Sequence, residues 1–263
     1  MKSTEHLTFA RDGATAIVTM NRPEAKNALS PAMLLGMADA WAEIDSNDEI
    51  RCAILTGAGG TFCSGMDLKA LGGADAEYQA RAKADPDLHW KALLRHHDVK
   101  KPLIAAVEGW AVAGGTEILQ ATDIRVAGEG AVFGVFEAKR GLFPLGGSTV
   151  RLRRQIPYTV AMELLLTARE VRAEEALRIG LIGHVVPDGT ALAKALEIAR
   201  MIGQNGPLAV EAIKRSVRET EGLSETEGLA RELELGWPIF ATRDAAEGQK
   251  AFAEKRPPRF TRQ

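Results

Sequence analysis

The chain has 263 residues, of which 46% are hydrophobic and 26% are charged, and its formal net charge is −2. This length allows a large buried core, and the composition is that of an ordinary globular protein. A charge so close to zero offers no general attraction to nucleic acid or to an anionic membrane surface.

Cysteine content and the first residues bear on the cellular compartment. Cys52 and Cys63 are the two cysteines, too few for a disulfide framework or a four-ligand metal site. The opening stretch, MKSTEHLTFARDG, contains early acidic residues and lacks the apolar core of a signal peptide. No apolar run approaches the length of a membrane-spanning helix. We therefore expect a cytoplasmic protein with no membrane partner.

The first elements are predicted by clear local signals. HLTFA (6–10) and ATAIVTM (14–20) are rich in β-branched and apolar residues and predict the two arms of a hairpin. Ser30 and Pro31 then supply an N-cap and a first-turn proline, which predict a helix through about Asp45.

The middle of the chain alternates apolar runs with glycine-rich loops. CAILTG (52–57), LIAAVEG (103–109) and DIRVAG (123–128) have the composition of buried strands. Residues 72–87 are polar and have no clear period, which predicts a mobile surface segment. Whether residues 72–95 close over a ligand is left open by the sequence.

Beyond Ser148 the pattern is helical, interrupted by a short strand at HVVP (184–187) and followed by four helices that end near Lys255. Strand–helix units followed by a helical tail predict an α/β fold. We divide the chain into a core domain, 1–200, and a helical C-terminal region, 201–263.

Two glycine-rich loops could supply backbone donors. One contains Gly65-Met66, and the other, Gly114-Gly115, opens a helix. The first N–H groups of a helix have no internal partner, and glycine lets other groups approach the backbone closely. One N–H from each loop could converge on a single anionic oxygen as an oxyanion hole. Each loop taken alone could equally be a tight turn.

Two glutamates interrupt apolar stretches. Glu117 lies in the first turn of the helix that begins at the glycine pair, and Glu137 follows AVFGVF. The helix dipole favours the Glu117 carboxylate, whereas apolar surroundings favour the neutral acid. Two carboxyl groups in different surroundings are typical of an acid–base pair. The alternative for each is a salt-bridged or capping residue.

Five motifs, in this order, resemble the crotonase (enoyl-CoA hydratase/isomerase) family: NRPEAKNAL, LTGAGGTFCSGMDLK, KPLIAAVEGWAVAGGTEI, TDIRVAGEGAVFGVFEAKRGLFPLGGS and AFAEKRPPRF. The resemblance implies a spiral of ββα units with a helical C-terminal trimerisation region. It implies a homotrimer or a homohexamer built as a dimer of trimers. The implied ligand is a coenzyme A thioester, and because coenzyme A is part of the substrate, no separate cofactor or metal is expected.

Carried over by position, the oxyanion donors are the N–H groups of Met66 and Gly114. Family hydratases use two glutamates, and Glu117 and Glu137 fill both positions. The resemblance therefore implies a hydro-lyase that adds water across the C2–C3 double bond of a trans-2-enoyl-CoA. We assign Glu117 to orienting and activating the water and Glu137 to delivering a proton to C2, and we leave open how the pair shares these roles.

The coenzyme-binding positions of the family also have counterparts. Ala25 and Lys26 lie on the loop expected to border the adenine, and Leu68 and Lys69 follow the first oxyanion donor. Lys255 resembles a position that can reach a phosphate, sometimes in a neighbouring subunit. The alternative for the three lysines is a solvated surface charge.

Departures from the family pattern bear on the acyl group. Met66 replaces a smaller residue, Phe136 replaces a proline and borders the substrate, and the FPLGGS stretch is one residue shorter than in some members. The stretch FGVFEAKRGLFPLGGS (133–148) resembles actinobacterial hydratases linked to bulky, sterol-derived thioesters, so we expect a role in fatty-acid or sterol side-chain β-oxidation. The alternatives are an enoyl-CoA isomerase, a specialised hydroxyacyl-CoA dehydratase, and a non-catalytic acyl-CoA- or RNA-binding homologue.

Overall fold

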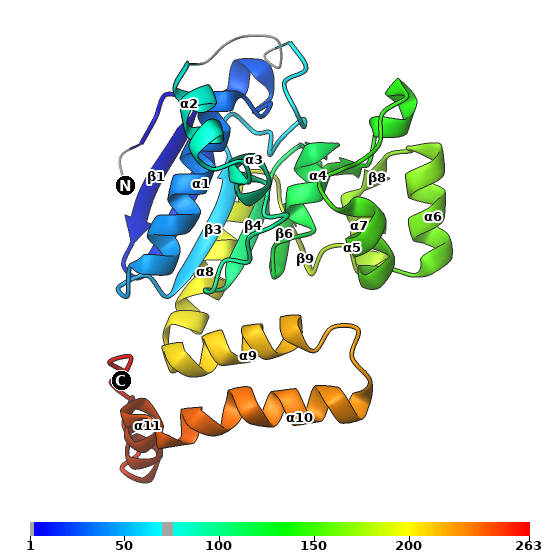
Figure 1. The fold of residues 1–263 in the computed structure, drawn as a ribbon. Helices are drawn as coiled ribbons and strands as arrows, with labels where there is room; N and C mark the ends of the chain where they lie inside the picture. Colours follow the sequence, from blue (N-terminus) through cyan, green and yellow to red (C-terminus); the bar gives the residue numbers. More distant parts are fainter. Residues whose placement is uncertain (1–2, 70–75) are drawn as a thin grey trace.

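A six-stranded sheet forms the centre of the computed structural model, which describes residues 3–69 and 76–263 (Figure 1). β1 and β2 form the predicted antiparallel hairpin, and every later neighbour in the sheet pairs in parallel. In spatial order the strands are β1 (Leu7–Asp12), β2 (Thr15–Met20), β3 (Cys52–Gly57), β4 (Leu103–Val107), β6 (Ile124–Gly128) and β9 (His184–Val186).

A smaller, three-stranded sheet lies beside the first. Its strands, in spatial order, are β5 (Trp110–Val112), β7 (Val132–Gly134) and β8 (Val171–Arg172). The chain enters the large sheet at β4 and the small sheet at β5, forms a helix, and repeats the two-sheet passage at β6 and β7. The expected spiral of ββα units is therefore confirmed. The sequence did not predict the strands of the small sheet, because two or three residues are too few to show alternation.

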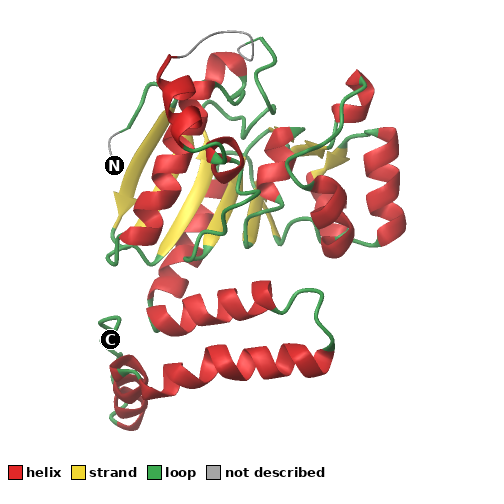
Figure 2. Cartoon of the chain, in the orientation of Figure 1, coloured by secondary structure: helices red, strands yellow, loops and turns green. Residues whose placement is uncertain are grey.

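Helices cover the sheets and connect their strands (Figure 2). The predicted helix start is confirmed, since the Ser30 side chain caps α1 by accepting a hydrogen bond from the Met33 N–H. The helices of the core are α1 (Pro31–Ser46), α2 (Ala76–Ala84), α3 (Leu88–Ala92), α4 (Gly114–Leu119), α5 (Ser148–Gln155), α6 (Tyr158–Thr167), α7 (Ala173–Arg178) and α8 (Ala191–Gly203), with 3-10 turns η1 (Pro23–Ala25) and η3 (Glu137–Arg140).

Residues 76–84 of the mobile surface segment predicted at 72–87 form a helix on the surface, α2, which the sequence did not predict. This helix has no buried residue, so its sequence carries no apolar stripe. Arg81 joins it to α1 through two hydrogen bonds to the Asp39 carboxylate, at 2.8 and 2.6 Å. Residues 72–75 of that prediction lie outside the described residues.

The C-terminal helices extend beyond the sheets. α8 packs on the large sheet with a stripe of alanines, Ala191, Ala195 and Ala199, against Ile54 and Ile104. Figure 1 shows that α9 and α10 run below the sheets and that α11 lies at their far end. These elements are α9 (Pro207–Glu219), α10 (Glu225–Gly236), the 3-10 turn η4 (Trp237–Ala241) and α11 (Arg243–Ala253). Together with α8, the three α-helices among them make the four helices predicted after HVVP.

The boundary expected after residue 200 falls inside the last turn of α8. That helix is part of the core, so the change in packing comes a few residues later, between α8 and α9. Of the helices in the described part of the chain, none has both the length and the apolar character needed to cross a membrane.

Candidate active site

A cavity of about 630 Å³ opens between α3, α4 and the segment from η3 to the start of α5. Most of its wall is apolar, and two carboxyl groups project into it. Its lining residues are Lys26, Ser64, Met66, Leu68, His89, Trp90, Leu93, Trp110, Val112, Ala113, Gly114, Glu117, Ile118, Phe136, Glu137, Arg140, Leu142, Phe143, Leu145 and Gly146.

Two backbone N–H groups converge on one side of this cavity. A Cβ atom on Gly65 would lie 3.0 Å from the Gly114 nitrogen, and a Cβ atom on Gly114 would lie 3.6 Å from the Met66 nitrogen. Among the described residues, neither the Met66 N–H nor the Gly114 N–H has a hydrogen-bond acceptor. Such a pair of free donors has the arrangement of an oxyanion hole.

The glycine pair Gly114-Gly115 is explained by how closely the start of α4 approaches the loop that contains Cys63. A Cβ atom on Gly115 would lie 2.4 Å from the Cys63 carbonyl oxygen, so no larger residue fits there. Just before the pair, Ala113 has φ 50° and ψ −126°, a left-handed conformation that strains a residue with a side chain. A hydrogen bond of 2.8 Å from the Ala113 N–H to the Gly134 carbonyl helps to hold this turn. The strain is concentrated at the residue that aims the Gly114 N–H.

Glu117 is buried, with 6% of its surface exposed, and its carboxylate faces the start of α5. The Ser148 N–H donates to Glu117 Oε1 at 3.1 Å. Burial raises the pKa of Glu117, while hydrogen bonds from the backbone of Ser148, Gly146 and Gly147 and from the Ser148 hydroxyl oppose that rise. This carboxylate is therefore buried but well supplied with donors.

Glu137 lies on the other side of the same cavity, at the first residue of η3. Its Oε2 atom is buried and has no hydrogen-bond partner among the described residues. Burial and, after it, the nearby Glu117 carboxylate raise the pKa of Glu137 to about 7. Near neutral pH this carboxyl group can hold a proton and release it.

The residues predicted to bind coenzyme A are only partly brought together. Lys26 and Leu68 line the cavity, and the Lys26 Nζ atom lies 5.8 Å from the centre of the Trp110 ring. Phe136 also lines it, next to Glu137. Ala25 and Lys69 adjoin lining residues in the chain but do not themselves line the cavity.

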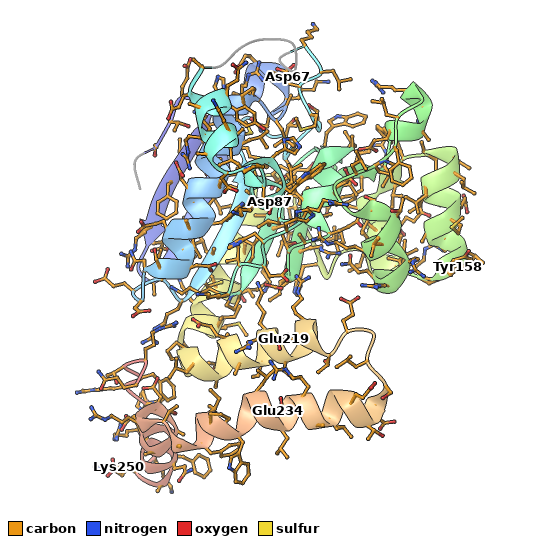
Figure 3. The ribbon with its side chains drawn as sticks, viewed as in Figure 1. Asp67, Asp87, Tyr158, Glu219, Glu234 and Lys250 are labelled. Atoms are coloured by element: carbon orange, nitrogen blue, oxygen red, sulfur yellow. The ribbon has the colours of Figure 1, made fainter. Side chains whose placement is uncertain are left out.

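Lys255 lies far from this cavity, just beyond α11. Figure 3 shows Lys250, on α11, at the opposite end of the molecule from Asp67, which follows the Met66 donor. Within one chain the structure does not bring Lys255 to the carboxylates. A role at the ligand would require the cavity of another subunit.

Several residues that line the cavity were not predicted from the sequence. His89, Trp90 and Leu93 come from or adjoin α3, which has five residues and too few turns to show a period. Leu142 and Phe143 belong to the loop after η3, where two large apolar side chains in a glycine-containing loop were a usable signal. Cys63, in contrast, lies behind the wall, and burial raises the pKa of its thiol to about 12.

Comparison with known proteins agrees with this architecture. The family model described as enoyl-CoA hydratase/isomerase matches residues 10–263. Enoyl-CoA hydratase EchA19 of Mycobacterium tuberculosis is 58% identical over 250 residues, 95% of this chain and 94% of that protein. The (E)-benzylidenesuccinyl-CoA hydratase of Thauera aromatica is 38% identical over 246 residues, 93% of this chain and 94% of that protein.

Solved structures share this fold. The crystal structure of an enoyl-CoA hydratase from Mycobacterium tuberculosis H37Rv has a TM-score of 0.91 and 42% identity, covering 99% of this chain and all of that chain. Both the sequence match and the structural match run through almost the whole molecule. The chain belongs to the enoyl-CoA hydratase/isomerase family.

Proposed function

We propose that this protein is an enoyl-CoA hydratase that adds water across the C2–C3 double bond of a trans-2-enoyl-CoA. The observation that carries the proposal is the placement of Glu117 and Glu137 in one cavity, beside two free backbone N–H groups. Family members named as hydratases, one of them 58% identical, support the same activity.

The N–H groups of Met66 and Gly114 would hold the thioester oxygen. Attack on C3 moves negative charge onto that oxygen as an enolate forms, and donors already aimed at it stabilise the transition state without reorganising. The apolar wall around them excludes water, which strengthens each hydrogen bond to the developing charge. The Lys26 ammonium, at the cavity edge, is suited to the negatively charged coenzyme.

The two glutamates would divide the proton transfers as their surroundings suggest. Glu117, supplied with N–H donors, serves as the carboxylate that takes a proton from water as the oxygen bonds to C3. Glu137, with a pKa of about 7, holds the proton that goes to C2. After turnover Glu117 carries the proton and Glu137 is ionised, so a transfer between them, directly or through solvent, restores the starting state. No metal or other cofactor takes part in these proposed steps.

The acyl group is the least defined part of the substrate. The cavity of about 630 Å³ has an apolar rim at Leu142, Phe143 and Leu145 that is about half exposed. This geometry supports a long or bulky acyl group, as in fatty-acid or sterol side-chain β-oxidation. A cytoplasmic location stays a prediction from the sequence.

We also propose that copies of the chain assemble through the C-terminal helices. These helices expose large apolar side chains that a stable monomer would normally bury: Ile213, Val217, Leu229, Leu233, Trp237 and Phe240. A trimer or a dimer of trimers would cover them. Light scattering of the purified chain should give three or six times 28.3 kDa, and a concentration-independent monomer would contradict the assembly.

The activity is tested by following the loss of enoyl-thioester absorbance with a short and a bulky trans-2-enoyl-CoA. The wild type should hydrate at least one of them, and Glu117→Gln and Glu137→Gln should each lose about 10²-fold or more in kcat. Binding without hydration of either thioester would overturn the proposal. Product analysis in that case distinguishes isomerisation or hydroxyacyl-CoA dehydration from simple binding, and retention of RNA that falls steeply with salt would indicate a nucleic-acid partner.

A further inference from the structure

The wall of the cavity contains a histidine, His89, that takes no part in the proposed hydration. His89, on α3, lines the cavity between apolar neighbours that include Trp90 and Leu93. The proposed oxyanion donors and both glutamates come from other elements. An imidazole in a mostly apolar wall therefore needs its own explanation.

Two contacts fix the orientation of this ring. The Tyr78 hydroxyl, on α2, lies 3.1 Å from His89 Nδ1. The His89 and Trp90 rings meet edge to face, with 4.7 Å between their centres. Nδ1 is thus engaged on the α2 side, while Nε2 has no hydrogen-bond partner among the residues that the structure describes. Because His89 lines the cavity and its Nδ1 is engaged, Nε2 is the ring nitrogen left for a ligand.

The ring is held in its uncharged form. Burial lowers the pKa of His89, so the imidazole is neutral at neutral pH, and burial raises the pKa of the Tyr78 hydroxyl, which keeps its proton. A neutral imidazole presents Nε2 as a donor or as an acceptor, depending on which nitrogen carries the hydrogen. A hydroxyl group on the ligand can satisfy either form, and a keto group satisfies the donor form.

An apolar acyl chain would leave this nitrogen without a partner. Covering a polar atom with hydrocarbon removes its water and returns no hydrogen bond, which is unfavourable. A ligand oxygen placed opposite Nε2 removes that penalty. A site built to bond a ligand oxygen also rejects the analogue that lacks it.

We propose that His89 is a specificity-determining residue that hydrogen-bonds an uncharged oxygen, hydroxyl or keto, carried by the acyl chain in addition to the thioester oxygen. The inference deepens the proposed function and rests on it, because that function places the acyl chain in this cavity. Tyr78 is the positioning residue that orients the ring.

The test compares matched substrates. Ten-carbon trans-2-enoyl-CoA thioesters are prepared unsubstituted and with a hydroxyl or keto group at the sixth, eighth or tenth carbon. They are assayed with wild type, with His89→Phe, which keeps a ring but removes the nitrogen, and with His89→Gln, which keeps a donor and an acceptor. His96→Phe is the matched control, since His96 bonds Asp87 outside the cavity.

At one position of the oxygen, the wild type should prefer the oxygenated thioester by about tenfold in kcat/KM, mainly through KM. His89→Phe should lose that preference, so that its kcat/KM values with the oxygenated and the unsubstituted thioester agree within about twofold. His89→Gln should retain part of the preference, and His96→Phe all of it. An equal preference in wild type and His89→Phe at every position would overturn the proposal.

A binding measurement separates this inference from the proposed activity. The saturated ten-carbon thioesters, with and without the same oxygen, cannot be hydrated, and calorimetry gives their Kd values. If hydration fails but the wild type still binds the oxygenated thioester about tenfold more tightly and His89→Phe does not, the specificity assignment stands and the activity falls. If hydration succeeds but neither the Kd values nor the kcat/KM values show a preference for the oxygenated thioester, the activity stands and the specificity assignment falls.

Discussion

The start of α4 and the η3 turn each place one glutamate in the same cavity, but the two glutamates have different neighbours. Glu117 faces the first N–H groups of α5 and the Ser148 hydroxyl. Glu137 has a buried oxygen with no described partner, and it lies next to the charge of Glu117. Burial raises the pKa of both groups, hydrogen-bond donors oppose that rise at Glu117, and the Glu117 charge adds to it at Glu137.

This difference arises from local geometry. The start of α5 is aimed at Glu117 by a glycine pair that allows the backbone to come close. Near η3, the Arg140 charge opposes the rise in the pKa of Glu137 but is outweighed by burial and by the Glu117 charge, while Lys139 Nζ lies over the Phe136 ring, 4.6 Å from its centre. Two identical side chains thereby differ in how strongly their surroundings oppose ionisation, as in an acid–base pair.

The largest effect should follow from disturbing the donors of Glu117. A Cβ atom on Gly146 would lie 2.6 Å from Glu117 Oε2, so Gly146→Ala must displace the carboxylate. We expect a loss of about 10²-fold in kcat, as for other misplacements of a catalytic group by about 1 Å. Gly203→Ala is the control, because a Cβ there meets no atom within 4 Å. Equal kcat in the two variants would show that the position of Glu117 is unimportant.

The pH dependence of the rate should identify Glu137 as the acid. With its pKa at about 7, it loses its proton above that pH, and kcat should fall about tenfold for each further pH unit. In Glu137→Gln the low residual rate should lack this alkaline limb, since the amide does not titrate there. A wild-type rate that stays flat from pH 6 to pH 9 would contradict the assignment.

A smaller effect is expected from the Ser148 hydroxyl. It helps to lower the pKa of Glu117, and it accepts a hydrogen bond of 2.9 Å from the Gln120 amide. Ser148→Ala should reduce kcat by about 3- to 10-fold and move the acidic limb of the pH profile upward. Ser46→Ala, on the exposed end of α1, is the control. A limb that does not move would mean that the hydroxyl is not needed by Glu117.

The smallest effect concerns stability. Folding raises the pKa of Glu137 from an ordinary value of 4.5 to about 7. The folded state therefore binds more protons across that window, and its stability relative to the unfolded state falls as the pH rises through it. Glu137→Gln lacks this loss. Between pH 5 and pH 8, its free energy of unfolding should therefore rise by about 1 kcal/mol relative to that of the wild type. Urea unfolding at pH 5 and at pH 8 gives the free energy of unfolding of both proteins. If the difference between the two proteins is the same at both pH values, Glu137 ionises in the folded state without cost.

The sequence predicted the parts of the site that depend on local pattern. Glu117 stands out as an acid after a glycine pair in an apolar stretch, and Ser30 and Pro31 mark a helix start that the structure confirms. The contact between Glu117 and Ser148 joins residues that are 31 positions apart, so it follows from the packing of α4 and α5. His89 could not be recognised for a similar reason, since its helix is short and its partner Tyr78 comes from another helix.

The division of roles between the two glutamates is tested most directly by infrared spectroscopy of the protonated carboxyl groups. Difference spectra between pH 6 and pH 8.5 are recorded for the wild type, Glu117→Gln and Glu137→Gln. We expect a protonated-carboxyl band that titrates near pH 7 in the wild type, disappears in Glu137→Gln and remains, at a lower pKa, in Glu117→Gln. A band that disappears in Glu117→Gln and persists unchanged in Glu137→Gln would show that the proton resides on Glu117 and would reverse the assigned roles.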